Sequence, residues 1–325
     1  MTLYPYPADW LGAYRWQGLD VSFMAAPGPC LGDAEPAEDP GDPRPAAVVL
    51  IHGFGACKEH WRHNVAALRR TRAVYALDLI GFGASSKPRS CLPHELPEAG
   101  SLCYGIDLWA AQVVAFLTAQ QTGAVQLVGN SIGGVVALAA ASRLEAEGRP
   151  CRGVVLVDCA QRALDEKRLA EQPTLLRWAR PGLRTLVRQR WLTQLLFRSL
   201  ARPGVIRRVL LQAYPSGANV DDQLVELLLR PALQPGASEA FRGFINLFED
   251  RLAPDLLATL STPVRMIWGQ QDPWEPIAEA RRWTHFPCVR ELHELPGLGH
   301  CPHDEAPALV NPLLASALAE ADTIS

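Results

Sequence analysis

A glycine-rich turn at residues 129–134, Gly-Asn-Ser-Ile-Gly-Gly, separates a short β-branched run from a helical pattern. The run covers residues 125–128, and the helical pattern covers residues 135–144. A Gly-x-Ser-x-Gly turn between a strand and a helix forces its serine into a strained backbone, and its glycines remove side chains that would clash. The sequence therefore predicts that Ser131 is exposed above the end of a strand, at the N-terminus of the next helix.

Two backbone N–H groups are expected beside this serine. The N–H of Ile132, at the start of the helix, is placed to stabilise an oxyanion. The turn at residues 52–55, His-Gly-Phe-Gly, directly follows the run at residues 47–51, and we expect the N–H of Phe54 to be the second donor. This pattern indicates a nucleophilic serine, although a glycine-rich turn with an incidental serine is the simpler alternative.

A serine hydroxyl needs a base, and two of the eight histidines are candidates. His300 ends the loop at residues 295–300, which follows the last β-branched run and is flexible enough to aim an imidazole at Ser131. His303 is the rival, and the residues alone do not exclude it. The other six histidines are expected to be surface or turn residues.

The third member should be a carboxylate between the serine and the histidine, because the chain order in this kind of site is serine, acid, histidine. Asp272 is favoured because it lies in a turn just after the run at residues 264–268. Asp158, at the end of an earlier run, is the alternative. Glu275 is expected to be a solvated neighbour. An acid here would fix the histidine tautomer and stabilise the imidazolium.

Short β-branched runs alternate with helical patterns along the chain, which is typical of an α/β fold with a mostly parallel central sheet flanked by helices. The runs are residues 47–51, 73–78, 125–128, 154–157, 264–268 and 291–295. A helical pattern at residues 106–117 is expected to be closed by Gly123. Residues 27–45, rich in Pro, Gly, Asp and Glu, are expected to form an exposed loop.

Strand signals are absent from residue 161 to about residue 254, where only amphipathic helical patterns occur. We interpret residues 161–254 as a helical cap inserted into an α/β-hydrolase core formed by residues 1–160 and 255–325.

The composition fits a globular protein, with 48% hydrophobic residues and a net charge of −3, and it gives no reason to expect nucleic acid as a partner. No apolar stretch approaches the roughly 20 residues of a membrane span. The N-terminus lacks the features of a secretory signal.

The eight cysteines are scattered without a Cys-x-x-Cys pair, so we expect reduced thiols in a cytoplasmic protein, no metal site and no cofactor.

Several motifs together resemble the α/β-hydrolases of photosynthetic organisms, within them the pheophytinase family, whose members remove phytol from pheophytin. The motifs are residues 52–55, 61–64, 78–85, 107–109, 129–134, 219–221, 272–274 and 299–305. The resemblance runs from about residue 16 to residue 311 and implies a triad of Ser131, Asp272 and His300. Two features depart from the pattern of the family: the loop at residues 27–45 is longer, and Pro312 should kink the last helix.

The resemblance implies an ester of a C20 isoprenoid alcohol, whose burial needs a long apolar channel. Five aromatic side chains are the predicted substrate contacts: Trp178, Trp191, Phe197, Phe244 and Trp274. Most aromatic residues of the cap are expected to serve only its core. Residues 162–208 also contain twelve Lys or Arg against three acids. This predicts a peripheral contact with an anionic membrane, with an ordinary solvated face as the alternative.

Other functions fit part of the pattern. Haloalkane dehalogenases and epoxide hydrolases share this architecture but carry an aspartate at the position of Ser131. A general carboxylesterase would have the same triad, and carbon–carbon hydrolases of aromatic degradation share the Gly-Asn-Ser-x-Gly-Gly turn. A pigment-binding or assembly factor on a hydrolase scaffold is the non-enzymatic alternative. The expected partner is a small apolar ester in every enzymatic reading except the carbon–carbon hydrolase.

Overall fold

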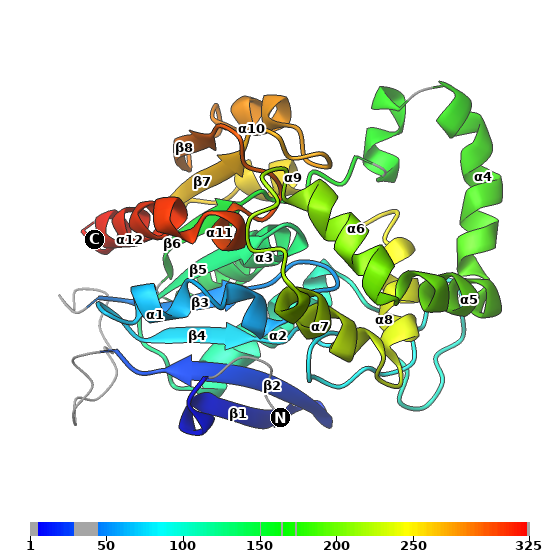
Figure 1. Cartoon of the computed structure of the whole chain (residues 1–325), viewed down its shortest axis with the longest axis horizontal. Helices are drawn as coiled ribbons and strands as arrows, with labels where there is room; N and C mark the ends of the chain where they lie inside the picture. Colours follow the sequence, from blue (N-terminus) through cyan, green and yellow to red (C-terminus); the bar gives the residue numbers. More distant parts are fainter. Residues whose placement is uncertain (1–5, 29–44, 150, 164, 173, 324–325) are drawn as a thin grey trace.

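The computed structural model describes residues 6–28, 45–149, 151–163, 165–172 and 174–323, so nearly all of the predicted 27–45 loop lies outside the described residues. Eight strands form one sheet in the order β1-β2-β4-β3-β5-β6-β7-β8 (Figure 1). Strand β2 is antiparallel to both of its neighbours, and all other pairs are parallel. The α/β-hydrolase architecture predicted from the sequence is thus confirmed. The strands are β1 (Leu11–Trp16), β2 (Leu19–Ala26), β3 (Ala47–Ile51), β4 (Val74–Leu77), β5 (Val125–Asn130), β6 (Cys151–Val157), β7 (Val264–Gly269) and β8 (Val289–Leu295).

The first two strands form a hairpin that the sequence reading missed. Gln17 and Gly18 join them, and both residues have positive φ, 51° and 78°. Two consecutive residues with positive φ are typical of the two-residue turns whose twist matches that of the flanking strands. The hairpin extends the sheet beyond β4 and does not contribute to the candidate site.

Both faces of the sheet are covered because alternate residues of each strand point to opposite sides. In β3, for example, Val49 and Ile51 pack into one apolar cluster, whereas Val48 and Leu50 pack into the other. The first cluster includes residues of α2 (Ile106–Ala119), α3 (Ile132–Ala146), α9 (Ala253–Leu257) and α10 (Ile277–Trp283). The second includes residues of α1 (Val65–Leu68) and α12 (Pro307–Asp322).

One prediction about helix geometry was wrong. Helix α2 ends at Ala119 rather than at Gly123, and Gln121 takes the left-handed conformation with φ 47°. Helix α12 extends from Pro307 to Asp322 with Pro312 inside it, and the predicted kink at Pro312 stays a prediction.

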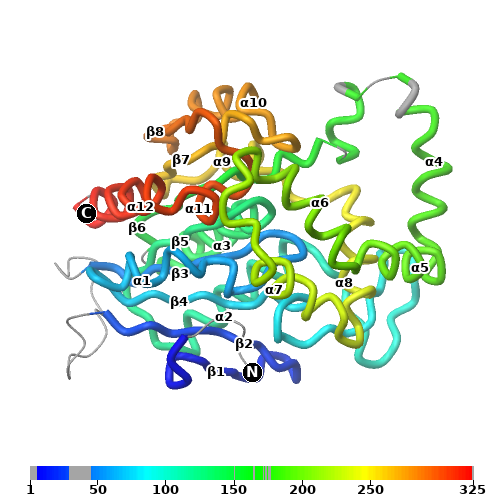
Figure 2. The backbone as a smooth tube through the Cα atoms, in the orientation of Figure 1, coloured from blue at the N-terminus to red at the C-terminus, as the bar shows by residue number. Residues whose placement is uncertain are grey.

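The segment between β6 and β7 contains a short helix, η3 (Glu166–Glu171), then five helices that we call the inserted helices, and finally α9. These are α4 (Thr174–Arg188), α5 (Arg190–Leu200), α6 (Pro203–Ala213), α7 (Asp222–Ala232) and α8 (Ala237–Ile245). In the described part of residues 161–254 all regular elements are helical, as predicted. Figure 1 shows α5 to α8 beyond the carboxyl ends of the parallel strands, and Figure 2 shows α4 as the outermost helix. The division into a core and a cap stays a prediction.

A buried ion pair between Arg62 and Asp304 binds residues of the segment that connects α6 and α7. Arg62, which precedes α1, donates to Asp304 of α11 (Pro302–Glu305), with Nε 2.7 Å from Oδ1, and to the carbonyl of Asn219 at 2.9 Å. The hydroxyl of Tyr214 donates to the other oxygen of Asp304 at 3.0 Å. Three of the sequence motifs, residues 61–64, 219–221 and 299–305, therefore meet here. None of the helices in the described parts of the chain combines the length and apolarity needed to cross a bilayer.

Candidate active site

Ser131 occupies a strained turn between β5 and α3, as the sequence predicts. Its φ and ψ are 55° and −126°, a conformation that L-residues adopt only when the surrounding structure imposes it. The surroundings here require glycine. A Cβ on Gly129 would lie 2.2 Å from the carbonyl oxygen of Gly133, and a Cβ on Gly133 would lie 2.4 Å from that of Ile51. The tight packing of the turn thus fixes the serine at the carboxyl end of β5.

The loop after β3 lies directly against this turn. A Cβ on Gly53 would be 3.1 Å from the Cβ of Ser131, so the His-Gly-Phe-Gly loop approaches the serine closely. Phe54 and Ser131 line one cavity. Ile132 is the first residue of α3, and N–H groups in the first turn of a helix have no acceptor within the helix. The structure thus brings the loop of Phe54 to Ser131, and Ile132 follows Ser131 at the start of α3, but their role as oxyanion donors stays a prediction.

His52 shapes this loop through its buried ring. Its Nε2 accepts a hydrogen bond from the N–H of Leu79 at 3.1 Å, and its Nδ1 lies 2.7 Å from the carbonyl oxygen of Gly53. Burial lowers the pKa of His52, which fits a neutral imidazole with Nδ1 as donor. The ring therefore links the loop after β3 to the loop after β4.

His300 and Asp272 form a hydrogen-bonded pair at the carboxyl end of β7. The Nδ1 of His300 lies 2.7 Å from Oδ2 of Asp272. The other carboxylate oxygen of Asp272 accepts the N–H groups of Trp274 at 2.8 Å and Glu275 at 3.1 Å. A carboxylate held in this way fixes the ring orientation and leaves Nε2 as the free nitrogen. His300 also lines the cavity that contains Ser131.

The alternative residues occupy other places. His303 is fully buried against the rings of Trp61 and His60, with centroid distances of 4.3 and 5.0 Å, and it does not line the cavity. Asp158 is also fully buried, and its Oδ1 accepts the N–H of Gly269 at 2.9 Å. Burial, together with the nearby Asp272, raises the pKa of Asp158 well above its usual range. The structure therefore brings His300 and Asp272 together rather than their rivals.

The sequence reading was wrong about His60, which is not a surface residue. Its side chain is buried, and its Nε2 lies 2.8 Å from the hydroxyl oxygen of Tyr214. Burial lowers the pKa of His60 to about 4. The ring is therefore neutral at physiological pH, and it borders the cavity from the side of the inserted helices.

A cavity of about 460 Å³ opens over Ser131. Its wall is mainly aliphatic and aromatic, with contributions from the loop after β3 and from α5, α6, α7 and α8. Three of the five predicted substrate contacts line it, namely Phe197, Phe244 and Trp274. The structure does not bring Trp178 and Trp191 to this cavity, because both side chains project into solvent.

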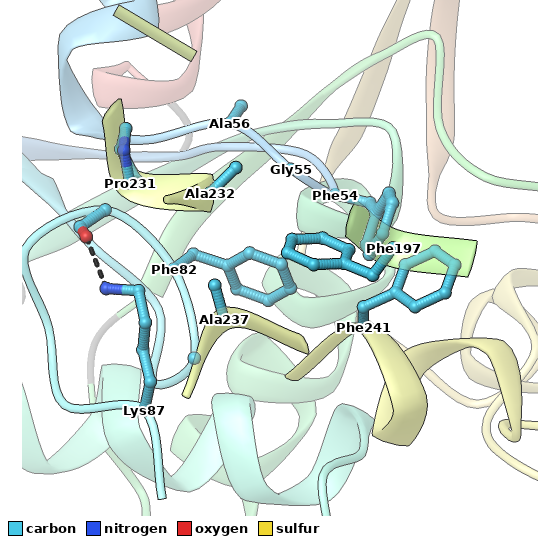
Figure 3. Close-up of a pocket in the computed structure, with 12 residues that line it drawn as sticks. Phe54, Gly55, Ala56, Phe82, Lys87, Phe197, Pro231, Ala232, Ala237 and Phe241 are labelled. Atoms are coloured by element: carbon cyan, nitrogen blue, oxygen red, sulfur yellow. Dashed lines mark hydrogen bonds between the residues drawn. The ribbon is translucent and has the colours of Figure 1, made fainter. Parts of the chain in front are cut away.

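A small side chamber of about 40 Å³ shares part of this wall (Figure 3). The rings of Phe54, Phe197 and Phe241 belong to both spaces. On the far side of the chamber, the ammonium group of Lys87 donates to the carbonyl of Gly83 at 2.6 Å and to Oε1 of Gln234 at 2.7 Å. Aromatic rings thus separate the main cavity from the side chamber, where the ammonium group of Lys87 is hydrogen-bonded within the protein.

The structure reveals two polar residues whose roles the sequence reading missed. The side-chain amide of Asn130 donates to the carbonyl of His300 at 3.0 Å and to that of Val157 at 3.1 Å. Glu275, expected to be solvated, instead lines the cavity and accepts the N–H of Gln161 at 2.8 Å. Burial raises the pKa of Glu275 to about 7. Asn130 precedes Ser131, and Glu275 lies three residues after Asp272, which was the signal available.

The sheet order, the strained serine at the end of β5 and the acid–histidine pair after β7 together define an α/β-hydrolase architecture. Residues 48–313 match the model of the alpha/beta hydrolase family, and the chain belongs to that family. Among the described residues, no group of three or more His, Cys, Asp or Glu side chains is arranged to hold a metal ion.

Comparison with known proteins gives distant relatives of different activities. The chain is 26% identical over 303 residues to the chloroplastic pheophytinase of Arabidopsis thaliana, covering 82% of this chain and 60% of that protein. It is 25% identical over 263 residues to a 2-hydroxy-6-oxo-2,4-heptadienoate hydrolase of Pseudomonas putida, covering 78% of this chain and 82% of that one. A thermophilic esterase from Thermogutta terrifontis has a similar fold, with a TM-score of 0.65, 20% identity and coverage of 96% and 98%.

Proposed function

We propose that the protein is a serine hydrolase that cleaves the carboxylic ester of a bulky apolar alcohol. The observation that carries the proposal is the 2.7 Å pair of His300 and Asp272, which shares a large apolar cavity with Ser131. A pair of this kind turns a serine hydroxyl into a nucleophile, and the apolar wall provides the space for the alcohol.

The reaction proceeds through an acyl-enzyme. The Oγ of Ser131 attacks the ester carbonyl carbon while its proton passes to Nε2 of His300, and Asp272 stabilises the imidazolium. The N–H groups of Phe54 and Ile132 bind the oxyanion, each lowering the barrier by about 3 kcal/mol. The carbon–oxygen bond then breaks, and the alcohol leaves with the proton of His300. Water, deprotonated by His300, attacks the acyl-enzyme and releases the carboxylic acid and Ser131.

The size and polarity of the cavity support an apolar substrate. Each buried methylene contributes about 0.8 kcal/mol, so a long alkyl or isoprenoid chain gains several kcal/mol from such a wall. The distant relationship to pheophytinase supports a phytyl ester of pheophytin or chlorophyll as the substrate. A general carboxylesterase acting on other apolar esters is the second candidate.

The cavity disfavours the carbon–carbon hydrolase reading. The Pseudomonas relative is named for a dienoate, which is a carboxylate anion. Among the described residues that line the cavity there is no Lys or Arg, and Glu275 is an acid. Burying an anion without a cationic or hydrogen-bonding partner is costly. A neutral ester avoids this cost.

Chromatography of the products tests the proposal, after incubation with pheophytin, chlorophyll and a p-nitrophenyl ester. Release of phytol from either pigment supports the phytyl ester, and cleavage of the p-nitrophenyl ester alone supports the general carboxylesterase. Pigment that stays bound and intact, together with a protein that a fluorophosphonate probe does not label, would instead assign a non-catalytic pigment-binding factor.

A cavity-filling variant tests the substrate size. Ile206, in α6, lines the cavity, so Ile206→Trp should lower kcat/KM for long-chain esters about tenfold or more, while an acetyl ester is cleaved nearly as before. Leu233→Trp is the matched control, because Leu233 is exposed and does not line the cavity. Equal losses for long and short esters would contradict the assignment of this cavity to the substrate chain.

The proposal includes peripheral contact of residues 162–208 with an anionic membrane, from which an apolar ester would be drawn. Ion pairs reduce the positive charge available to such a contact. Among the described residues, seven of the twelve cations pair with acids: Arg162, Lys167, Arg168, Arg180, Arg184, Arg190 and Arg207. The basic composition therefore does not by itself locate the contact.

A further inference from the structure

Helix α4 is amphipathic with its charged side turned toward the protein. Arg180 is buried and donates to Oε1 of Gln172 at 2.7 Å, and Arg184 pairs with Glu166. Both guanidinium groups lie over the ring of Phe248, 5.6 and 5.1 Å from its centroid. A surface helix normally buries its apolar side and exposes its charges. Here the arginines make the internal contacts, which leaves the apolar side for another partner.

The apolar side of α4 is solvent-exposed. Trp178 is 82% exposed, and Leu183 and Leu186 are exposed as well. At 100° per residue these three side chains fall on one half of the helix, opposite Arg180 and Arg184. Figures 1 and 2 show α4 at the outer limit of the molecule. The exposed half of α4 is thus an unpartnered apolar face.

Helix α5, which follows α4 in the chain, also exposes apolar side chains. Trp191 is 67% exposed, and Leu195, one turn later, is 60% exposed. A second stripe contains Leu196 and Leu200, which are also exposed, and Leu200 lines the cavity over Ser131. Helix α5 therefore carries the exposed Trp191 and Leu195 on one side and borders the cavity through Leu200 on another.

Positive charge accompanies these apolar side chains. Arg198 on α5, Arg202 at the start of α6 and Arg208 on α6 are exposed, and among the described residues none of them forms an ion pair with an acid. Arg198 lies one turn after Leu195, on the same side of α5. The exposed surface thus combines tryptophan, leucine and unpaired arginine.

We infer that α4 and α5 form a membrane-docking face for an anionic phospholipid bilayer, consisting of Trp178, Leu183, Leu186, Trp191 and Leu195. This inference rests on the proposed function, because it assigns the route by which an apolar ester reaches the cavity. Tryptophan prefers the boundary between headgroups and acyl chains, leucine enters the apolar layer, and arginine attracts anionic headgroups.

Charge complementarity favours lipid over a second copy of the chain. A two-fold symmetric dimer places the same patch on both sides of its interface. The arginines around the docking face would then confront one another, which opposes association. An anionic lipid surface supplies the opposite charge along the whole face.

Vesicle flotation at low salt, without any substrate, tests the inference. Wild-type protein should float with vesicles of phosphatidylcholine and phosphatidylglycerol but not with phosphatidylcholine alone. W178A/W191A/L195A should bind the anionic vesicles about tenfold more weakly, and so should R198Q/R202Q/R208Q. The matched control is L96A/L309A, which removes two exposed leucines outside these helices and should bind like wild type.

Equal flotation of wild type with neutral and anionic vesicles, or unchanged binding by both multiple variants, would overturn the inference. A second outcome would also overturn it: wild type forms a dimer and binds no vesicles, and W178A/W191A/L195A is a monomer. That outcome would assign the face to a second copy of the chain. Turnover of a soluble p-nitrophenyl ester is measured in parallel. A protein that floats but does not cleave the ester supports docking and contradicts the proposed function. A protein that cleaves the ester but never floats supports the proposed function and contradicts docking.

A second measurement avoids destabilising substitutions. Brominated acyl chains in the anionic vesicles should quench part of the wild-type tryptophan fluorescence. The conservative variant W178F/W191F should still float but lose this quenching. Unchanged quenching in W178F/W191F would place other tryptophans at the lipid and overturn the assignment of this face.

Discussion

The side-chain amide of Asn130 donates a hydrogen bond to the backbone carbonyl of His300, with Nδ2 3.0 Å from the oxygen. Asn130 immediately precedes Ser131, so the residue before the predicted nucleophile holds the loop that carries the predicted base. The same amide donates to the carbonyl of Val157 at the end of β6. One side chain thus connects the turn of Ser131, the loop of His300 and the end of β6.

We expect Asn130→Ala to lower kcat about 100-fold with little change in KM, because a misplacement of about 1 Å in catalytic geometry has an effect of this size. Asn246→Ala is a matched control, since the Asn246 amide also donates to two carbonyls but lies away from the cavity. Steady-state kinetics on a p-nitrophenyl ester checks the prediction. Equal losses in both variants would show that Asn130 acts only through general stability.

Asp272→Asn should lower kcat about 10⁴-fold, because an amide in place of the carboxylate favours the wrong histidine tautomer. Asp158→Asn should change kcat less than about tenfold, because burial raises the pKa of Asp158 and keeps it neutral. Asn retains an oxygen that can accept the N–H of Gly269. A larger loss in Asp158→Asn than in Asp272→Asn would contradict the assignment of the acid.

Glu275 should make the stability of the fold depend on pH. Its pKa is raised from 4.5 to about 7 by burial, so between these values the folded chain binds a proton that the unfolded chain has lost. Stability therefore falls as pH rises through this window, by up to roughly 3 kcal/mol. Glu275→Gln should remove that loss, because Gln stays neutral and still accepts the N–H of Gln161.

Urea unfolding at about pH 5 and about pH 8 measures the effect. The variant should gain stability over wild type at the higher pH and show little gain at the lower pH. Glu226→Gln is the control, since Glu226 is exposed and its substitution should leave the pH dependence unchanged. A pH dependence that is identical in wild type and Glu275→Gln would contradict the account of this carboxyl group.

Asp304→Ala should destabilise the fold by roughly 3–5 kcal/mol, because it leaves the buried guanidinium of Arg62 without its main counterion. Glu294→Ala removes the partner of Arg281 in an exposed pair and should have a much smaller effect. The free energy of unfolding in urea compares the two. Similar losses of unfolding free energy in both variants would show that burial does not make the Arg62–Asp304 pair more important for stability than an exposed pair.

The six core strands could be predicted to within a few residues because most of them are short apolar runs, as expected for parallel strands buried on both faces. Strand β8, which contains Glu291 and Glu294, is the exception. The sequence reading missed the β1–β2 hairpin, whose Gln17-Gly18 turn lacks the usual asparagine or aspartate before glycine. It also misplaced the end of α2, because Gln121 rather than a glycine takes the left-handed conformation. Local propensity does not report which residue accepts such strain.

For the candidate site, the chain order of Ser131, Asp272 and His300 pointed to the group that the structure brings together. The environment of Glu275 was not predictable, because its burial depends on Gln161 and other residues distant in sequence. Trp178 and Trp191 were assigned to the substrate by residue type alone. The amphipathic helical patterns of residues 161–254 could not show which side of α4 faces outward.

The most direct test of the account is the reaction of the protein with a fluorophosphonate probe, followed by mass spectrometry of the labelled peptide. The account predicts a single adduct on Ser131 in the wild type and no adduct in Ser131→Ala, whose kcat for a p-nitrophenyl ester should fall by about 10⁴-fold or more while the fold is retained. Labelling of another residue, or ester cleavage by Ser131→Ala at the wild-type rate, would contradict it.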